Sequence, residues 1–193
     1  MKLILMSQRS YVYDKDYIEN RDCLDQRWMP FLSACNLLPI IAPNNFETVQ
    51  SYLKKFTFDG FLLTGGNDTP ERIAVENHLI EYAIENNLPL LGICHGMQVI
   101  QRYFGITLVD YPGKNHRKED VLLHGNLTTV NSYHTIASQD TAPELTVWAK
   151  TADNWVKAIS HTQHNIHGMM WHPERDFPYI ERDINFIKKV FKC

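Results

Sequence analysis

Short apolar runs alternate with helical patterns through the first half of the chain, and this alternation limits the fold more than any other feature. The runs at 2–7, 38–43, 60–64 and 88–93 have the length of strands and carry little polar alternation. The segments at 23–36, 46–56, 71–85 and 94–104 repeat apolar residues every three or four positions, as amphipathic helices do. Apolar strands separated by helices predict a parallel sheet that is covered on both faces.

The second half has a different pattern. Shorter strand candidates lie at 121–130, 145–149, 156–160 and 167–171, with turn residues between them, and a closing helix is predicted over 180–191. We expect these strands to form a small antiparallel extension or edge of the same sheet. Because ligand sites in open α/β sheets gather at the carboxyl ends of the strands, the residues that follow each strand are the first candidates for a site.

The composition is typical of a soluble globular chain. Of 193 residues, 44% are hydrophobic and 21% are charged, which predicts one folded domain over residues 1–193 and excludes a disordered chain. The net charge of −3 lacks the basic excess of a nucleic-acid binder. No apolar run approaches the ~20 residues of a membrane span, and the first is too short for a signal peptide. The four cysteines have no C-x-x-C spacing, so we expect reduced thiols and a cytoplasmic location.

The segment Gly92-Ile93-Cys94-His95-Gly96 directly follows an apolar run and has the pattern of a nucleophile elbow, a sharp turn from strand to helix that presents a reactive side chain. Glycines on both sides of Cys94 leave room for so tight a turn. At a helix start the peptide dipole favours a thiolate, and the next backbone N–H, from His95, would face a developing oxyanion. Cys94 is therefore the predicted nucleophile, with a small buried hydrophobic residue as the alternative.

Two further segments supply the partners that a thiol nucleophile needs. In Trp171-His172-Pro173-Glu174, His172 would be the base and Glu174 its orienting carboxylate, because residues two apart in an extended segment lie on one side. Leu63-Thr64-Gly65-Gly66 closes the third predicted strand. Paired glycines let backbone approach a ligand closely, so the N–H of Gly66 is the second predicted oxyanion donor, with a plain turn as the alternative.

Four motifs together resemble one protein family. They are TGGND at 64–68, LGICHGMQ at 91–98, NSYH at 131–134 and HGMMWHPE at 167–174. In this order they resemble the class I glutamine amidotransferase domain, in its stand-alone γ-glutamyl hydrolase branch. The resemblance implies a flavodoxin-like α/β fold, doubly wound, with a mostly parallel sheet, helices on both faces and a small antiparallel extension in the C-terminal half.

The same resemblance implies roles for individual residues. Cys94, His172 and Glu174 would form a catalytic triad, with Gly66 and His95 as oxyanion donors. Six residues would contact the γ-glutamyl part of the substrate, including its α-amino and α-carboxylate groups: Gly65, Gln98, Asn131, Ser132, Tyr133 and His134. The resemblance implies neither a cofactor nor a metal.

The motifs do not determine which amine leaves when the amide bond is broken. The chain has no P-loop pattern and no segment for a synthetase domain, so we expect hydrolysis of a small-molecule γ-glutamyl amide without an obligatory synthetase partner. If the leaving group is nucleotide-linked, it is anionic and needs cations; the predicted ones are Arg9, in the loop after the first strand, and Arg117. The basic loop around Arg117 adds Lys114, His116 and Lys118, with a solvated surface run as the alternative. Tyr11 and Tyr13 could stack on a base, with ordinary exposed loop tyrosines as the alternative.

Three other interpretations stay open. The chain could be a glutaminase subunit that delivers ammonia to a separate synthase, and the isolated chain would then be nearly inactive. It could be a non-catalytic binding or sensing protein. A metal site at His161, His164 and His167 is the third, which the expected hairpin disfavours because period-two strands do not bring these positions to one face. Neither nucleic acid nor a membrane is an expected partner, and the sequence does not set the oligomeric state.

Overall fold

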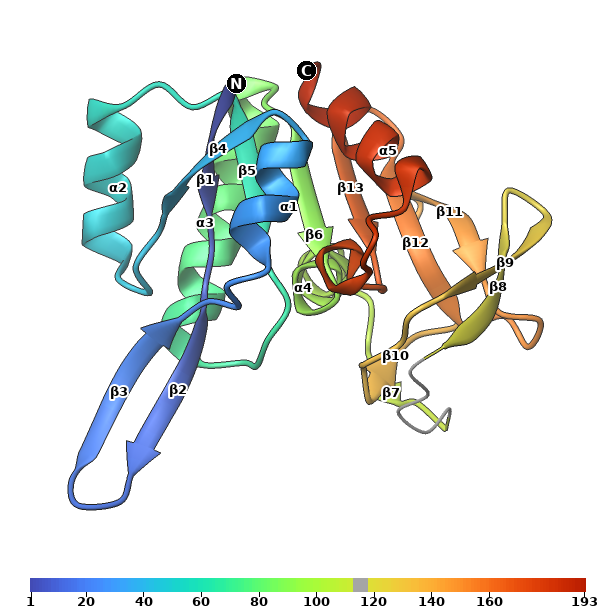
Figure 1. Ribbon diagram of the computed structural model, residues 1–193, viewed down its shortest axis with the longest axis horizontal. Coiled ribbons are helices and arrows are strands. Elements are labelled where there is room, and N and C mark those ends of the chain that lie inside the picture. Colours follow the sequence, from blue (N-terminus) through green and yellow to red (C-terminus); the bar gives the residue numbers. More distant parts are fainter. Residues whose placement is uncertain (113–117) are drawn as a thin grey trace.

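One mixed sheet of nine strands runs through the computed structural model, which describes residues 1–112 and 118–193 (Figure 1). Its parallel part is, in spatial order, β4 (Leu37–Ile41), β1 (Lys2–Met6), β5 (Gly60–Leu63), β6 (Leu90–Ile93) and β13 (Ile166–Met169). The antiparallel part continues with β12 (Val156–His161), β11 (Leu145–Lys150), β8 (Glu119–Leu123) and β9 (Asn126–Val130). The predicted parallel sheet and its antiparallel extension are both confirmed.

Helices cover both faces of this sheet. Within the described residues they are α1 (Trp28–Ala34), α2 (Phe46–Lys55), α3 (Pro70–Asn86), α4 (His95–Tyr103), α5 (Glu181–Phe191) and the short η1 (Pro173–Arg175). In Figure 1, α1 and α5 lie in front of the sheet and α3 lies behind it. Since α3 contacts both α2 and α4, these three helices cover one face, and α1 and α5 cover the other (Figure 1). Helices on both faces of a mostly parallel sheet make the doubly wound, flavodoxin-like fold that the sequence predicts. Each helix in the described part of the chain is too short or too polar to cross a bilayer.

Local sequence sets the bounds of the longest helix, α3. The Thr69 side chain caps its start by accepting a hydrogen bond from the N–H of Arg72 at 3.3 Å. Its end is set by Asn87, which takes the left-handed conformation with φ 52°. The strands on either side of α3, β5 and β6, are buried along their whole length, as expected for strands with helices on both faces.

An antiparallel hairpin of β2 (Arg9–Asp14) and β3 (Ile18–Cys23) replaces the predicted loop after the first strand and the predicted helix start at residue 23. It projects beyond the carboxyl end of β1, away from the sheet (Figure 1). The helix starts later, at Trp28, because Asp25 accepts a hydrogen bond from the N–H of Arg27 at 3.0 Å and forms a turn there. β-branched and aromatic residues in the hairpin favour strands, which is the signal that the sequence analysis missed.

The single strand predicted over 121–130 is instead the pair β8 and β9. The chain reverses at His124 and Gly125, whose φ values of 48° and 82° are both positive. A two-residue hairpin turn of this kind usually carries Asn-Gly or Asp-Gly, so His-Gly gave no clear turn signal. Beside the main sheet, β7 (Val109–Asp110) and β10 (Ile136–Ala137) form a small second pair.

Candidate active site

Cys94 lies where β6 ends and α4 begins, in the sharp turn that the sequence predicts. Its φ of 51° and ψ of −103° are costly for a residue with a side chain, and such strain is typical of functional turns. The turn is anchored because the N–H of Cys94 donates to the carbonyl of Met169 at 2.8 Å. A side chain at Gly96 would collide with the backbone of Leu63, and one at Gly92 would stand 2.5 Å from Gly96. The sulfur is therefore fixed at the start of a helix, where the dipole favours a thiolate.

His172 comes close to Cys94 because β13 and β6 are neighbouring parallel strands. Met169 lies beside Ile93 in their register, so both chains leave the sheet at the same edge. The Nδ1 of His172 lies 2.6 Å from Oε1 of Glu174, and both side chains are buried. The Cys94 side chain is close enough to this imidazole to favour its charged form.

Burial and hydrogen bonding oppose each other at His172. Burial disfavours the imidazolium and lowers the pKa of His172, but the hydrogen bonds with Cys94 and Glu174, together with their negative charge, outweigh it and raise that pKa to about 9. Because Glu174 holds Nδ1, the other ring nitrogen, Nε2, is left for the sulfur and the substrate. The predicted nucleophile, base and orienting carboxylate thus lie at one edge of the sheet.

Asn131, predicted to contact substrate, binds the backbone of His172. Its Oδ1 accepts a hydrogen bond from the N–H of His172 at 2.8 Å, and its Nδ2 donates to the carbonyl of the same residue at 2.7 Å. Nδ2 also donates to Asp176 at 3.0 Å. The amide of Asn131 therefore positions the base, and its contact with substrate stays a prediction.

A cavity of about 280 Å³ contains Cys94 and both predicted oxyanion donors, Gly66 and His95. Three of the predicted substrate-binding residues line it, and the loop after β5 and the segment before β10 complete the wall: Gln98, Tyr133, His134, Asn67, Asp68, Thr135 and Ile136. Ser132 is buried beside this wall, with its Oγ 3.5 Å from Nδ1 of His134. The cavity thus joins the reactive sulfur to polar groups that can hold a small polar molecule.

His134 is held in this wall by a residue that the sequence analysis missed, Lys157. The Nζ of Lys157 donates to Nε2 of His134 at 2.7 Å and forms a buried ion pair with Glu119 at 2.9 Å. The ring of His134 stacks on Tyr111, with the centroids 4.8 Å apart. Burial, and after it the charge of Lys157, lower the pKa of His134 to about 3, so its imidazole is neutral and its proton lies on Nδ1.

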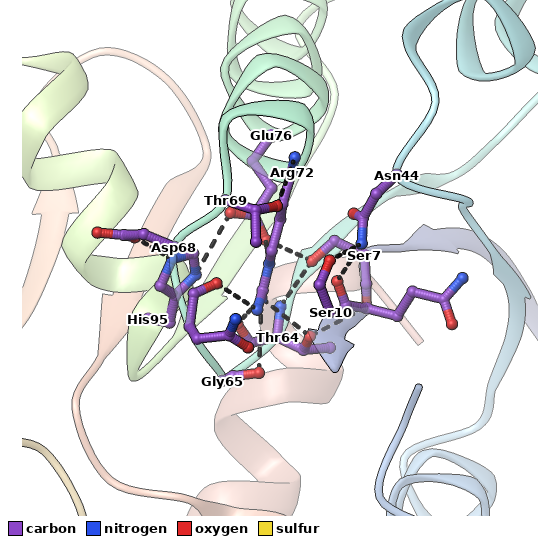
Figure 2. Close-up of polar contacts among 12 residues, drawn as sticks. Ser7, Ser10, Asn44, Thr64, Gly65, Asp68, Thr69, Arg72, Glu76 and His95 are labelled. Carbon is purple, nitrogen blue, oxygen red and sulfur yellow. Dashed lines mark hydrogen bonds and ion pairs between the residues drawn. The ribbon is translucent and has the colours of Figure 1, made fainter. Parts of the chain in front are cut away.

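The loop that carries Gly66 is held by a buried arginine, Arg72 of α3. Its Nη2 donates to the carbonyl of Thr64 at 2.6 Å (Figure 2). Its Nη1 donates to the carbonyl of Asn67 at 3.3 Å. Gly66 lies between these two carbonyls with φ 150°, and a side chain there would collide with the guanidinium. Arg72 therefore fixes the peptide groups on both sides of the predicted oxyanion donor.

Arg72 is itself held by a buried ion pair. Its Nε donates to Oε1 of Glu76 at 2.9 Å, and both side chains are fully buried. The Ser7 hydroxyl donates to the same Glu76 oxygen at 2.6 Å and accepts a hydrogen bond from the N–H of Thr64 at 3.0 Å (Figure 2). This network connects β1, the loop after β5 and α3 beneath the site.

The side chain of His95 fixes the second predicted oxyanion donor. Burial lowers the pKa of His95 to about 4, so the ring is neutral. Its Nε2–H donates to Oδ1 of Asp68 at 2.6 Å, and its Nδ1 lies 3.4 Å from Glu76. Asp68 also pairs with Arg102 at 2.8 Å; although burial opposes the charged form, these hydrogen bonds lower the pKa of Asp68. The first residue of α4 is thus tied to the loop that carries Gly66.

We expect the substitution Arg72→Lys to lower kcat by about ten- to a hundredfold with little change in KM. A lysine keeps a positive charge beside Glu76 but cannot bind both loop carbonyls at once. The Gly66 N–H would then no longer be held in the direction of the oxyanion. Because this contact forms mainly in the transition state, its loss lowers kcat and has little effect on KM. Steady-state kinetics with a γ-glutamyl anilide would measure this, beside a thermal melt that confirms folding. Arg182→Lys, which alters a comparable pair with Asp183 outside the site, is the matched control. A rise in KM alone would contradict this role of Arg72.

The predicted cations are found in different places. Arg9 lies in β2, and with Tyr11 it lines a second cavity of about 400 Å³. Tyr13 follows in the same strand, with the guanidinium of Arg21 4.4 Å from its ring centroid. Lys118 is exposed. Three residues of the predicted basic loop lie outside the described residues: Lys114, His116 and Arg117.

The histidines of the alternative metal interpretation have other partners. Nδ1 of His167 lies 2.7 Å from the Ser160 hydroxyl, and Nε2 lies 2.8 Å from the side-chain oxygen of Asn165. Across residues 1–112 and 118–193, no group of three or more His, Cys, Asp or Glu side chains could hold a metal ion. A larger cavity, of about 880 Å³, lies between α5 and the antiparallel strands; it is lined by Trp148, Phe186 and His167 and by none of the residues predicted for the γ-glutamyl site.

The residues that the sequence analysis missed share one signal, a charge on an otherwise apolar face. Arg72 and Glu76 are four positions apart, on the same face of α3 as the buried Val75 and Leu79. Lys157 lies inside the apolar strand β12. Because charged side chains are almost never fully buried without a partner, each of these positions could have been singled out before the structure was known.

The chain is similar to known proteins along most of its length. A family model described as Glutamine amidotransferase class-I matches residues 18–185. The gamma-glutamyl-CDP-amidate hydrolase of Campylobacter jejuni is 32% identical over 86% of this chain and 86% of its own. Anthranilate synthase component 2 of Azospirillum brasilense is 35% identical over 81% of this chain and 85% of its own. The glutaminase domain of Trypanosoma brucei CTPS, solved with bound acivicin, covers 100% of this chain and 94% of its own with a TM-score of 0.74 at 12% identity, which shows a shared fold.

Proposed function

Because the chain belongs to the class I glutamine amidotransferase family, we propose that it hydrolyses a γ-glutamyl amide bond through a thioester on Cys94 and releases L-glutamate. One observation carries this proposal: the imidazole of His172, held by the Glu174 carboxylate at 2.6 Å, lies at the same edge of the sheet as Cys94, which favours its charged form. A thiol, a base and an orienting acid are what covalent acyl transfer needs.

In the first half of the reaction, the Cys94 thiolate attacks the γ-carbonyl carbon. The carbonyl oxygen becomes negatively charged and accepts hydrogen bonds from the N–H groups of Gly66 and His95, each typically worth ~3–4 kcal/mol in the transition state. With a pKa of about 9, His172 is protonated at neutral pH, so it stabilises the thiolate and can give its proton to the departing nitrogen. The C–N bond breaks and the amine leaves.

In the second half, a water molecule replaces the amine. The neutral His172 accepts a proton from this water while its oxygen attacks the thioester carbonyl, and the same two N–H groups hold the oxyanion. Glutamate leaves, and the thiolate and imidazolium are restored. Glu174 keeps the imidazole in position through Nδ1–H in both halves of the reaction.

We propose γ-L-glutamyl-CDP-amidate as the substrate, so that the second product is cytidine diphosphoramidate, for use in modifying a capsular polysaccharide. The support is the similarity to the Campylobacter jejuni protein, which extends over 86% of both chains. The reaction then consumes one small molecule and water.

The second candidate function is that of a glutaminase subunit, which would pass ammonia from glutamine to a separate synthase. It is favoured by the 35% identity to anthranilate synthase component 2 of Azospirillum brasilense. The two functions differ in the leaving group and in the need for a partner, because ammonia is useful only where a second enzyme consumes it.

An assay of the purified chain separates the two functions. Glutamate release is measured with glutamine, a γ-glutamyl peptide, a γ-glutamyl anilide and γ-glutamyl-CDP-amidate. We expect turnover without any added protein and the highest kcat/KM for the nucleotide amidate. Turnover of glutamine alone, appearing only after a synthase is added, would instead establish the glutaminase subunit. No glutamate release under either condition would refute both functions.

A further inference from the structure

The second cavity, of about 400 Å³, lies between the β2–β3 hairpin and the residues around His172. Gly65 lines it, and a side chain added to Gly65 would collide with the His172 ring, 2.4 Å from Cε1 and 3.3 Å from Nε2. The adjacent Gly66 lines the cavity that contains Cys94. Two neighbouring glycines thus separate a cavity around the nucleophile from a cavity on the side of the base.

Arg175 lines this cavity and is poised to bind an anion. Its guanidinium lies against Tyr133, with Cζ 4.5 Å from the ring centroid, and its side chain is 22% exposed. Its Nε is buried, lies 3.5 Å from Oε1 of Glu174, and has no hydrogen-bond partner among the residues that the structure describes. A buried donor of this kind is stabilised when a ligand oxygen binds to it.

The hairpin contributes a second guanidinium and an aromatic ring. Arg9 is paired with Cys23, and Tyr11 with Arg21, in the register of β2 and β3, so these four side chains share one face of the hairpin. Because Arg9, Tyr11 and Cys23 all line the cavity, this is the face turned toward it. The ring of Tyr11 is 53% exposed and can be stacked upon.

One carboxylate, that of Asp25, also lines the cavity. It is paired with Arg27 at 2.6 Å, and this hydrogen bond lowers the pKa of Asp25 to about 2 despite partial burial. Its negative charge is therefore balanced by a neighbouring arginine. Asp25 therefore does not neutralise Arg9 or Arg175, and the other carboxylate near Arg175 is Glu174, 3.5 Å from its Nε.

We propose that this cavity is the leaving-group subsite, in which Arg9 and Arg175 bind the phosphates of a nucleotide amidate and Tyr11 stacks on its base. The inference rests on the proposed γ-glutamyl hydrolase function and adds the residues that select the substrate. Arginine binds phosphate through two parallel N–H groups, and an aromatic ring stacks on any base. Ammonia, the leaving group of glutamine, would use none of these contacts.

The chemistry of the bond that breaks places the phosphate on this side. In an amidate the scissile nitrogen is bonded directly to phosphorus, so a phosphate lies one bond beyond the atom that His172 protonates. When the C–N bond breaks, the γ-carbonyl carbon stays on the Cys94 sulfur. The nitrogen takes the proton from Nε2 of His172 and leaves with the phosphate. The Cε1 edge of the His172 ring, next to Nε2, faces Gly65, which lines the cavity with the two arginines.

The first test compares a charged with a neutral leaving group in the variants Arg9→Met and Arg175→Met. The measured quantity is the ratio of kcat/KM for γ-glutamyl-CDP-amidate to kcat/KM for a γ-glutamyl anilide. We expect each variant to lower this ratio about ten- to a hundredfold, because a charge-assisted contact to phosphate is lost. Lys15→Met removes the same charge from the hairpin turn, outside the cavity, and is expected to leave the ratio unchanged. An unchanged ratio in both arginine variants overturns the proposal.

The second test measures binding without turnover. CDP is titrated calorimetrically into the Cys94→Ala protein, with and without each arginine substitution. We expect CDP to bind, and the dissociation constant to rise at least tenfold when either arginine is replaced. Absence of CDP binding overturns the proposal. If the protein turns over no γ-glutamyl substrate but CDP binding depends on the arginines, the proposed hydrolase function fails and the anion subsite stands.

Discussion

Replacing Cys94 by alanine is expected to lower glutamate release from every γ-glutamyl substrate by about 10⁵- to 10⁶-fold, the loss typical when a covalent nucleophile is removed. The reason is that the other groups of the site can hold the amide but cannot form the thioester. The thermal melt should stay close to that of the native chain, because the side chain removed is small. Glutamate release is the measurement, and intact-mass analysis should detect a γ-glutamyl adduct on the native chain alone.

Two variants make this test specific. Cys94→Ser keeps a hydrogen-bond partner for His172 but offers a hydroxyl that does not ionise at neutral pH, so it should be almost as inactive. Cys193→Ala removes an exposed thiol outside the site and should leave the rate unchanged. Full activity in Cys94→Ala would remove the thioester mechanism altogether.

The second large effect is expected from Glu174→Gln, which should lower kcat by about 10²- to 10⁴-fold. The substitution removes the negative charge that lies 2.6 Å from Nδ1 of His172. The imidazolium loses stabilisation, so the pKa of His172 should fall from its present value of about 9. Because the thiolate–imidazolium pair exists only below that pKa, the alkaline limb of the kcat/KM profile should move to lower pH.

The measurement is a pH–rate profile of the native chain and the variant, in which the Cys94–His172 pair titrates as a unit. Glu181→Gln, an exposed carboxylate at the start of α5, is the control that removes the same charge elsewhere. A variant that is slow but keeps the native alkaline limb would show that Glu174 acts only through the shape of the site.

The parts of the fold that could be predicted are those in which local pattern and tertiary environment agree. The apolar runs and the helical spacing predict the strands β5 and β6 and the helix α3. A parallel strand that is buried on both faces needs apolar residues at nearly every position, so its sequence is easy to identify. The elbow at Cys94 was found for a related reason: its glycines are required by collisions with Leu63 and with each other, which any sequence making this turn must avoid.

The parts that could not be predicted depend on contacts between distant segments. Arg72 is explained by carbonyls in the loop after β5, and Lys157 by Glu119 and His134, none of which adjoins it in sequence. Asn131 could be singled out from its motif, but its pairing with the backbone of His172 required the two chains to be placed side by side. Sequence motifs can therefore identify which side chains are candidates for a site. The hydrogen-bond partners of those side chains depend on which segments the fold brings together.

The hairpin of β2 and β3 shares no ladder with the nine-stranded sheet, and side-chain hydrogen bonds from Asn44 to Ser10 and Asp22 join its base to the loop after β4. Its sequence can therefore drift without breaking the hydrogen bonding that holds the triad. In the proposed subsite, Arg9 and Tyr11 belong to this hairpin, whereas Arg175 directly follows Glu174 in the sequence. Grafting residues 9–23 from a related hydrolase onto this chain is therefore expected to change the preference for the leaving group while the proposed triad stays in place.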